Sequence, residues 1–194
     1  MLPKQIENLV AEIAKLPGLG QRQATRLAFH LLSLPPSVRK NLSVAIEKLK
    51  EIKTCRNCFN FAADNLCIFC RDKNRDEKTI CVVEDMLDIV PIERTGQYKG
   101  VYHILGGLVS PLDGLTPDKL KIRELVGRVK KDSIKEIILA LNPSVEGDTT
   151  ALYIERALKN LPVRMTRLAR GLATGSDLEY TDTDTLSEAI SGRK

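Results

Sequence analysis

Apolar residues recur at helical spacing through the first fifty residues of the chain. Two runs have members three or four residues apart: Ile6, Leu9, Val10, Ile13 and Leu16, then Ala24, Leu27, Ala28, Leu31 and Leu32. The segment LPGLG at 16–20 interrupts this pattern, and two prolines at 35–36 open a third amphipathic run. The spacing predicts that residues 3–52 form helices joined by short turns.

From residue 79 onward, short apolar runs alternate with amphipathic segments. The apolar runs predict strands at 79–84, 101–105, 136–141 and 163–169. The segments between them predict helices at 85–96, broken by Pro91, at 123–132, and at 148–161 with Asp148 as the N-cap. This alternation indicates an α/β fold with a mostly parallel sheet and helices on both faces. The tail is expected to hold an acidic loop and a short helix from about Thr185.

The composition supports a folded, basic protein. The chain has 194 residues, of which 43% are hydrophobic and 28% charged, so it can bury a core. Its net charge of +5 is uneven, because Lys and Arg outnumber Asp and Glu by 8 to 4 in residues 1–52 but are outnumbered by 5 to 2 in residues 176–194. A basic front half is what a phosphate-backbone partner requires, although a solvated charged surface explains so small an excess equally well.

Nothing in the sequence points to a membrane. No apolar run approaches the roughly 18 residues that a membrane-spanning helix needs. The N-terminal segment is amphipathic and carries Glu7 and Glu12, so it does not read as a signal peptide. We therefore expect a cytoplasmic protein without a membrane partner.

Four of the five cysteines lie in the segment CRNCFNFAADNLCIFC at 55–70. Two CxxC pairs at this spacing favour a tetrahedral zinc site made by Cys55, Cys58, Cys67 and Cys70, because cytoplasmic chains seldom keep structural disulfides. All four ligands come from the protein, so the site has no open position for water and is expected to be structural. Iron in the same sulfur set remains the alternative, since the ligands alone do not exclude it.

The segment LPGLGQRQATRLAFHLL has the features of a phosphate-binding hairpin. Gly18 and Gly20 are expected to let the backbone take positive φ and approach a partner closely. The turn leads into a helix N-terminus, where free N–H groups can hold a phosphate, with Arg22 and Arg26 on the exposed face beside it. Such a hairpin contacts the DNA backbone without reading bases. An ordinary turn between two helices with glycine caps is the alternative.

The order of these features resembles the RecR family of bacterial recombination mediators. The hairpin segment comes first and the four cysteines second, followed by ICVVED, GGLVSPLDG and NPSVEGDTTA and then by the tail TGSDLEYTDTDTLSEAI. The resemblance covers nearly the whole chain. It implies a helix-hairpin-helix region at 1–52, a four-cysteine zinc finger at 53–76, a Toprim domain at 77–175 and a C-terminal tail at 176–194.

The resemblance also implies partners and an assembly. Members of the family form a ring-like tetrameric clamp around single- and double-stranded DNA, joined through the N-terminal hairpin regions and through a tail exchanged with a neighbour. They work with RecO and RecF to load RecA onto single strands coated by SSB, in the cytoplasm at the nucleoid. The family's basic hairpin residues fall on Arg22 and Arg26. The family commonly has Lys at the first of these, and Arg keeps the charge.

Toprim enzymes hold Mg²⁺ with a strand-end Glu and an Asp-x-Asp pair, because this hard ion takes oxygen ligands. Here Glu84 ends the first strand, but Asn142 and Ser144 stand where the paired aspartates would be. We therefore expect a scaffold without catalytic residues. The resemblance implies that Glu84, Glu146 and Asp148 form an acidic patch that faces RecO or binds Mg²⁺ weakly. The alternative makes Glu84 a solvated carboxylate and Asp148 only a helix cap.

Two other functions stay open at this point. The first is a Mg²⁺-dependent Toprim nuclease or topoisomerase, against which the Asn142 and Ser144 positions argue. The second is a protein adaptor that binds DNA only in complex with a partner. The chain has no G-x-x-x-x-G-K-[ST] motif, so a P-loop ATPase is not supported.

Overall fold

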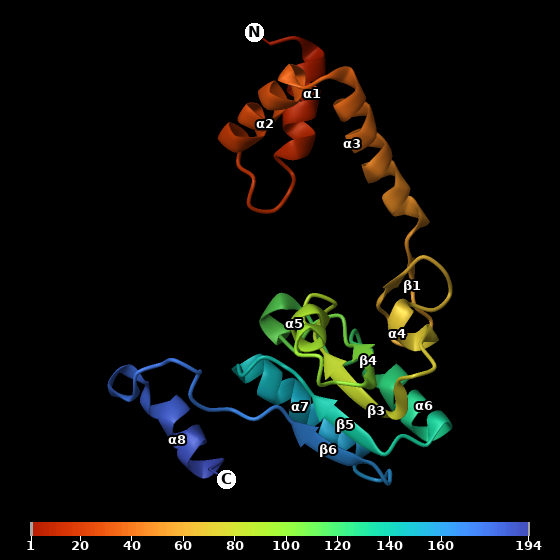
Figure 1. The fold of residues 1–194 in the computed structure, drawn as a ribbon, viewed down its shortest axis with the longest axis vertical. Coiled ribbons are helices and arrows are strands. Elements are labelled where there is room, and N and C mark those ends of the chain that lie inside the picture. Colours follow the sequence, from red (N-terminus) through yellow and green to blue (C-terminus); the bar gives the residue numbers. More distant parts are fainter. Residues whose placement is uncertain (1, 194) are drawn as a thin grey trace. The chain divides into compact units, whose positions relative to one another are not determined.

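The computed structural model describes residues 2–193 and divides into two compact units, which meet in the chain between Ile52 and Lys53. The first unit contains three helices, α1 (Lys4–Ile13), α2 (Gln21–Ser33) and α3 (Pro36–Lys48), followed by a short 3-10 helix, η1 (Leu49–Glu51) (Figure 1). Its buried core is small: Val10 on α1 packs against Ala24 and Ala28 on α2. The predicted helices of residues 3–52 are confirmed, and two small alanines let α1 and α2 approach closely.

The second unit begins with a small β-hairpin, continues into a parallel sheet and closes with the tail that carries α8 (Thr183–Ser191). The hairpin pairs β1 (Lys53–Thr54) with β2 (Phe61–Ala62), and α4 (Ile68–Arg71) follows it. The sheet contains β3 (Asp76–Val83), β4 (Gly100–Ile104), β5 (Glu136–Leu139) and β6 (Arg164–Arg167) in the order β4-β3-β5-β6, and every neighbouring pair is parallel. The predicted α/β class is therefore confirmed.

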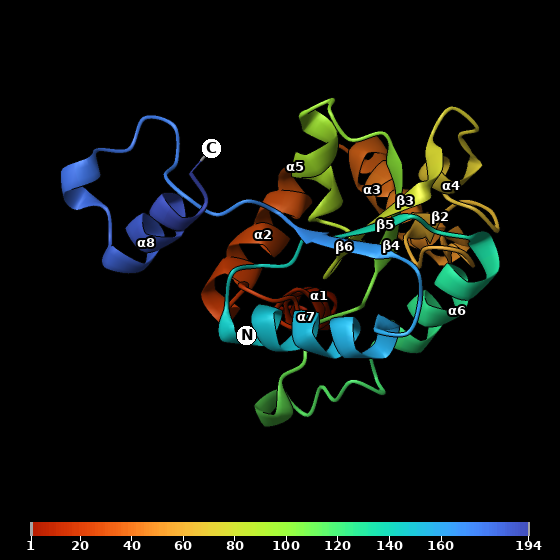
Figure 2. The same ribbon diagram turned by 90° about the horizontal axis from the view of Figure 1, so that it is seen from below.

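Both faces of the sheet are covered, as the continuous apolar strands predict. On one face, Ile80 and Val82 of β3 pack with buried residues of α6 (Ile122–Asp132) and α7 (Val145–Leu158). On the other face, Cys81 and Val83 pack with Ile89 of α5 (Ile89–Arg94). Figure 2 shows α6 and α7 on one side of the strands and α5 on the other.

Several local expectations are corrected by the structure. Helix α7 begins at Val145, three residues before Asp148, and its N-cap is Ser144, whose hydroxyl accepts a hydrogen bond from Gly147 N. Pro91 does not break α5, because it is the third residue of the helix and an N–H at that position has no partner within the helix. The tail helix α8 (Thr183–Ser191) starts two residues earlier than expected, because Asp182 caps it.

The remaining elements are short turns of 3-10 helix, η2 (Pro111–Asp113) in the long loop after β4 and η3 (Leu178–Tyr180) before α8. Within residues 2–193, none of the helices combines the length and apolarity that a membrane crossing needs.

Candidate functional sites

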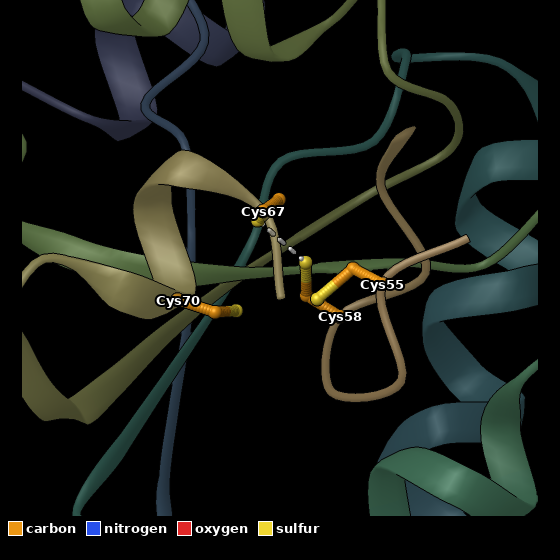
Figure 3. A group of neighbouring side chains, drawn as sticks. All are labelled: Cys55, Cys58, Cys67 and Cys70. Carbon is orange, nitrogen blue, oxygen red and sulfur yellow. Dashed lines mark hydrogen bonds between the residues drawn. The ribbon is translucent and has the colours of Figure 1, made fainter. Parts of the chain in front are cut away.

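The four clustered cysteines point their sulfurs toward a common centre (Figure 3). Their Sγ atoms all lie within 4.8 Å of one another, and the Cys58 and Cys67 sulfurs are 3.4 Å apart. Tetrahedral zinc with bonds of about 2.3 Å would separate its sulfurs by about 3.8 Å, so the cluster has the right size. Three of the cysteines are buried and Cys70 is half-buried, as a closed structural site requires.

Local backbone geometry brings the two pairs together. In the first knuckle, Cys55 N donates to Asn60 O at 2.7 Å and Phe59 N donates back to Cys55 O at 3.0 Å. Phe59 takes a positive φ of 67°, which closes this turn. In the second knuckle, Cys67 precedes α4, so that Cys70 lies one turn along the helix on the same side.

Hydrogen bonds between the thiols change the pKa values of the cysteines in the cluster. Hydrogen bonding from the Cys58 thiol, with help from Cys70, lowers the pKa of Cys67 to about 2. The same hydrogen bond raises the pKa of Cys58 above its ordinary value of 9.0. The donated hydrogen bond thus favours the thiolate form of Cys67. A divalent metal has to displace the remaining protons, so metal binding releases protons.

The cysteine finger (residues 53–71) packs against the edge strand β4. Ile104 N at the end of β4 donates to Cys58 O at 2.9 Å. The Phe59 ring meets His103 edge-on at 5.4 Å between centroids. On the α4 side, Phe69 meets Tyr102 at 5.2 Å. The finger therefore extends the packing of the sheet at its β4 edge.

Arg75 connects the finger to the Toprim-like sheet through side-chain contacts. The sequence pattern did not predict this role. Its guanidinium lies 4.7 Å from the centre of the Phe69 ring and makes two hydrogen bonds to Glu93 on α5, at 2.5 and 2.9 Å. Tyr102 donates its hydroxyl proton to the same carboxylate. The sequence signal was weak, because a single Arg between a cysteine cluster and a strand has no characteristic spacing.

The hairpin of the first unit presents its predicted phosphate-binding residues to solvent. Gly18 has a positive φ of 78°, as expected, but Gly20 has φ −78° and is simply the extended N-cap of α2. The positive φ expected at Gly20 is therefore wrong, because one left-handed residue is enough to reverse this turn. Arg22 and Arg26 are both exposed on α2, and neither forms an ion pair with any of the described residues.

The strand-end carboxylate Glu84 lies at the carboxyl edge of the sheet, where the strand order reverses between β3 and β5. Its Oε2 atom accepts a hydrogen bond from Asn142 Nδ2 at 3.2 Å. Burial, with added repulsion from Asp88 and Asp85, raises the pKa of Glu84. An amide therefore faces Glu84 where a metal-binding Toprim enzyme would place a carboxylate. Among residues 2–193, the carboxylates do not converge into a group of three or more ligands.

Asp148 belongs to a different environment from Glu84. Its Oδ1 atom accepts from Arg167 Nη1 at 2.9 Å and from Arg170 Nη2 at 2.6 Å. The hydrogen bond from Arg170 is the main reason why the pKa of Asp148 is lowered. Glu146 is exposed in the first turn of α7. The two arginines therefore neutralise the negative charge of Asp148, which leaves Glu84 and Glu146 as the unpaired carboxylates of the predicted acidic patch among residues 2–193.

Arg167 and Arg170 were missed by the sequence reasoning. In the segment RMTRLAR, Arg167 is the last residue of β6 and Arg170 lies three residues beyond it, and basic residues at the end of a strand were the available signal. Together with Asn142, Asp148 and Glu188, they line a cleft of about 1230 Å³. The cleft lies beyond the carboxyl ends of β5 and β6, which is where open α/β sheets bind ligands.

The fold and its sites define a Toprim-type protein that carries a helical hairpin unit and a four-cysteine finger. Comparison with known families agrees with each part. The description "RecR, helix-hairpin-helix" matches residues 6–50, "Toprim domain" matches residues 78–169, and "RecR, C-terminal" matches residues 171–194.

Curated proteins match over the full length. "Recombination protein RecR" of Myxococcus xanthus is 48% identical over 195 residues, covering 100% of this chain and 99% of its own length. The proteins of the same name from Rubrobacter xylanophilus and a Nocardioides species are 48% and 47% identical, covering 98% and 97% of this chain and 96% of their own lengths in both cases. The chain belongs to the RecR family of recombination proteins.

Proposed function

We propose that this protein is a DNA-binding recombination mediator of recombinational repair, acting in the cytoplasm at the nucleoid. In this proposal it forms a ring-like clamp on DNA and works with RecO and RecF to load RecA onto single strands coated by SSB. The domains would be the hairpin region at 1–52, a zinc-finger domain at 53–76 that contains the cysteine finger and Arg75, the Toprim domain at 77–175 and the tail at 176–194. The exposed basic start of α2 carries the proposal, and the full-length match to recombination proteins supports it.

The start of α2 is suited to hold a phosphate. The first turn of the helix has no acidic residue, and Gly20 offers no side chain to cap it, so its first N–H groups are free for a ligand. Arg22 and Arg26 lie one turn apart on this helix and are exposed. Gly18 keeps the approach open, since nothing lies within 4 Å of where its side chain would be. Contacts of this kind bind DNA independently of its sequence.

Replacing both arginines tests this role. R22A/R26A should bind single- and double-stranded DNA at least tenfold more weakly. The slope of log affinity against log salt should become shallower by about 0.7 to 0.9 for each phosphate that the variant no longer neutralises. K40A/K48A is the matched control, because it removes two exposed positive charges from α3 in the same unit. Unchanged DNA binding by R22A/R26A would contradict the proposed role of the hairpin in binding DNA.

The finger is proposed to hold one structural Zn²⁺ per chain through Cys55, Cys58, Cys67 and Cys70. When bound, the metal would fix the two knuckles and supply no catalysis, since four protein sulfurs fill its coordination sphere. Purified protein should contain about one zinc per chain and show no visible absorbance. A coloured protein that contains iron would assign the site to the alternative metal.

The Toprim domain is proposed to be a scaffold without enzymatic activity. The hydrogen bond from Asn142 to Glu84 supports this, because the amide brings no negative charge to hold Mg²⁺. Nicking of DNA that requires Mg²⁺ and disappears in Glu84→Gln would instead assign an enzyme. The half-buried carboxylate Glu84 and the exposed carboxylate Glu146 are proposed to contact RecO, with Asp148 contributing through its arginine pairs.

The assembly is proposed to be a homotetrameric ring. Helix α3 supports this, because it has no buried residue and carries an exposed apolar stripe at Val38, Leu42, Ile46 and Leu49. These side chains fall on one face of the helix and on the turn that follows it. An unpartnered stripe of this kind on a folded chain is typical of a subunit interface.

A further inference from the structure

A row of positive side chains crosses the amino-terminal edge of the sheet, opposite the edge that holds Glu84. Each of the four strands contributes one residue near its start. Lys99 and Lys135 directly precede β4 and β5, Arg164 is the first residue of β6, and Lys78 is the third residue of β3. We call these four residues the basic rim. Lys130 and Lys131, in the last turn of α6, carry two more positive charges beside it.

Backbone hydrogen bonds fix the spacing of the basic rim. Lys135 N donates to Lys78 O at 2.8 Å, and Arg164 N donates to Lys135 O at 2.9 Å. On the other side, Lys99 O accepts from Asp76 N at 2.8 Å. Lys78, Lys135 and Arg164 therefore lie on adjacent strands, about 4.8 Å apart, with Arg164 in register with Glu136, one position beyond Lys135. Lys99 lies on the other side of β3, beside Asp76. The end of α6 is tied to the same edge, because Lys78 Nζ donates to the backbone oxygen of Asp132 at 2.7 Å.

Four carboxylates share this edge, those of Asp76, Glu77, Asp132 and Glu136. Asp76 accepts from Thr79 Oγ1 at 2.7 Å and from Lys78 N at 2.9 Å, and Glu136 accepts from Thr166 Oγ1 at 3.0 Å. Asp132 lies 3.8 Å from Arg128 Nε. Within residues 2–193, no member of the basic rim has a carboxylate oxygen within 4.0 Å of its side-chain nitrogens. The four rim residues together with Lys130 and Lys131 outnumber the carboxylates Asp76, Glu77, Asp132 and Glu136, so this edge keeps a net positive charge that can attract an external anion.

We propose that the basic rim is a second phosphate-binding surface for nucleic acid, separate from the hairpin. The proposal rests on the proposed DNA binding and extends it to the Toprim domain. All four side chains are exposed, and long flexible cations suit a phosphate backbone. An acidic protein partner fits less well, because segments 76–79, 99–100, 130–136 and 159–164 expose no large apolar side chain to anchor it.

The test compares two variants of equal charge in the full-length protein. K99Q/K135Q/R164Q removes three rim charges while keeping part of each side-chain stem. K73Q/R123Q/R156Q removes three exposed charges from elsewhere in the second unit. Fluorescence anisotropy measures the binding of each to labelled single- and double-stranded oligonucleotides over a range of salt. Circular dichroism and zinc content verify that both variants fold.

The rim variant is expected to bind DNA about tenfold more weakly than the control variant and with a shallower salt slope. Adding R22A/R26A should weaken binding further, because the two surfaces contact different phosphates. A rim variant with the affinity and slope of the control variant overturns the inference and leaves the hairpin role intact. Wild-type protein that binds no DNA would instead overturn the proposed function.

An acidic partner gives a different result in the same assays. If the rim variant keeps the DNA affinity of the control variant but loses binding to a labelled poly-glutamate peptide, the surface belongs to an acidic protein. That result overturns the nucleic-acid assignment.

Discussion

Gly147, in the first turn of α7, has no space for a side chain. A Cβ atom added there would collide with the backbone oxygen of Asn142, the residue that faces Glu84. Gly127, in the middle of α6, is the opposite case, since nothing lies within 4 Å of its missing Cβ. Both residues lie in helices and look alike in the sequence, so only their surroundings distinguish them.

We expect Gly147→Ala to lower the free energy of unfolding by about 2 kcal/mol or more, because the backbone of the loop before α7 must shift. Gly127→Ala is the matched control and should raise the same quantity by about 0.5 to 1 kcal/mol, since alanine favours the helix. Urea denaturation followed by circular dichroism measures both. Equal effects of the two substitutions would contradict the contact described for Gly147.

The cluster of Arg75, Glu93 and Tyr102 should make the stability depend on pH. Burial raises the pKa of Glu93, but hydrogen bonds from Arg75 and Tyr102 outweigh it, and the net pKa is lowered from 4.5. A lowered pKa in the folded state stabilises the protein above the unfolded value, and this stabilisation is lost as the pH falls through the folded value.

Wild-type protein should therefore lose stability on acidification below about pH 4.5 more steeply than Glu93→Gln, which cannot titrate at this position. Denaturation midpoints measured at a series of pH values check this. Glu77→Gln serves as the control, because Glu77 is exposed and should leave the slope unchanged. Identical slopes for wild type and Glu93→Gln would show that the cluster does not link folding to pH.

At the scale of elements, β4 is an edge strand that the finger covers. The sheet order places β4 at one end, and the finger contacts it through Cys58, Phe59 and Phe69. An exposed edge strand offers unpaired backbone groups to other chains, so this cover protects the protein from aggregation. The finger has few apolar residues of its own, so we expect its folding to depend on a bound metal.

Metal removal should therefore loosen β4 together with the finger. In hydrogen-exchange experiments, chelation or Cys55→Ser should speed exchange in residues 53–71 and 100–104. Exchange in β6, at the opposite end of the sheet, should change least. Equal protection of β4 with and without metal would contradict this coupling. A Cys55→Ser protein that stays folded and assembled yet loses DNA binding would show that the finger itself contacts DNA.

At the scale of the whole molecule, the exposed stripe on α3 predicts assembly. Wild-type protein should have the mass of four chains in sedimentation experiments with DNA. L42E/I46E places two charges in the stripe and should shift the mass toward smaller species. S37E/N41E is the control, because it adds the same charge to α3 outside the stripe. A strict monomer with and without DNA would contradict the clamp.

The parts that sequence predicts well are those that depend on local pattern. Apolar spacing located the helices of residues 3–52 and the four strands, and two CxxC pairs identified the cysteine cluster. The N-cap of α7 was predicted wrongly as Asp148. Ser144 is an equally good capping residue, and it lies where the helix begins. Arg167 and Arg170, which pair with Asp148, come from a different element, so no local pattern connects them to it.

The sequence by itself determined the order of the parts, the α/β class, the four-cysteine cluster and the family, because spacing and residue type carry that information. Only the tertiary structure decided which charges are free and which are paired. It turned Asp148 toward two arginines, placed an amide against Glu84, and lined four cations along one edge of the sheet. The physical reason is that charge–charge contacts form between residues distant in the chain, and strand register brings those residues together.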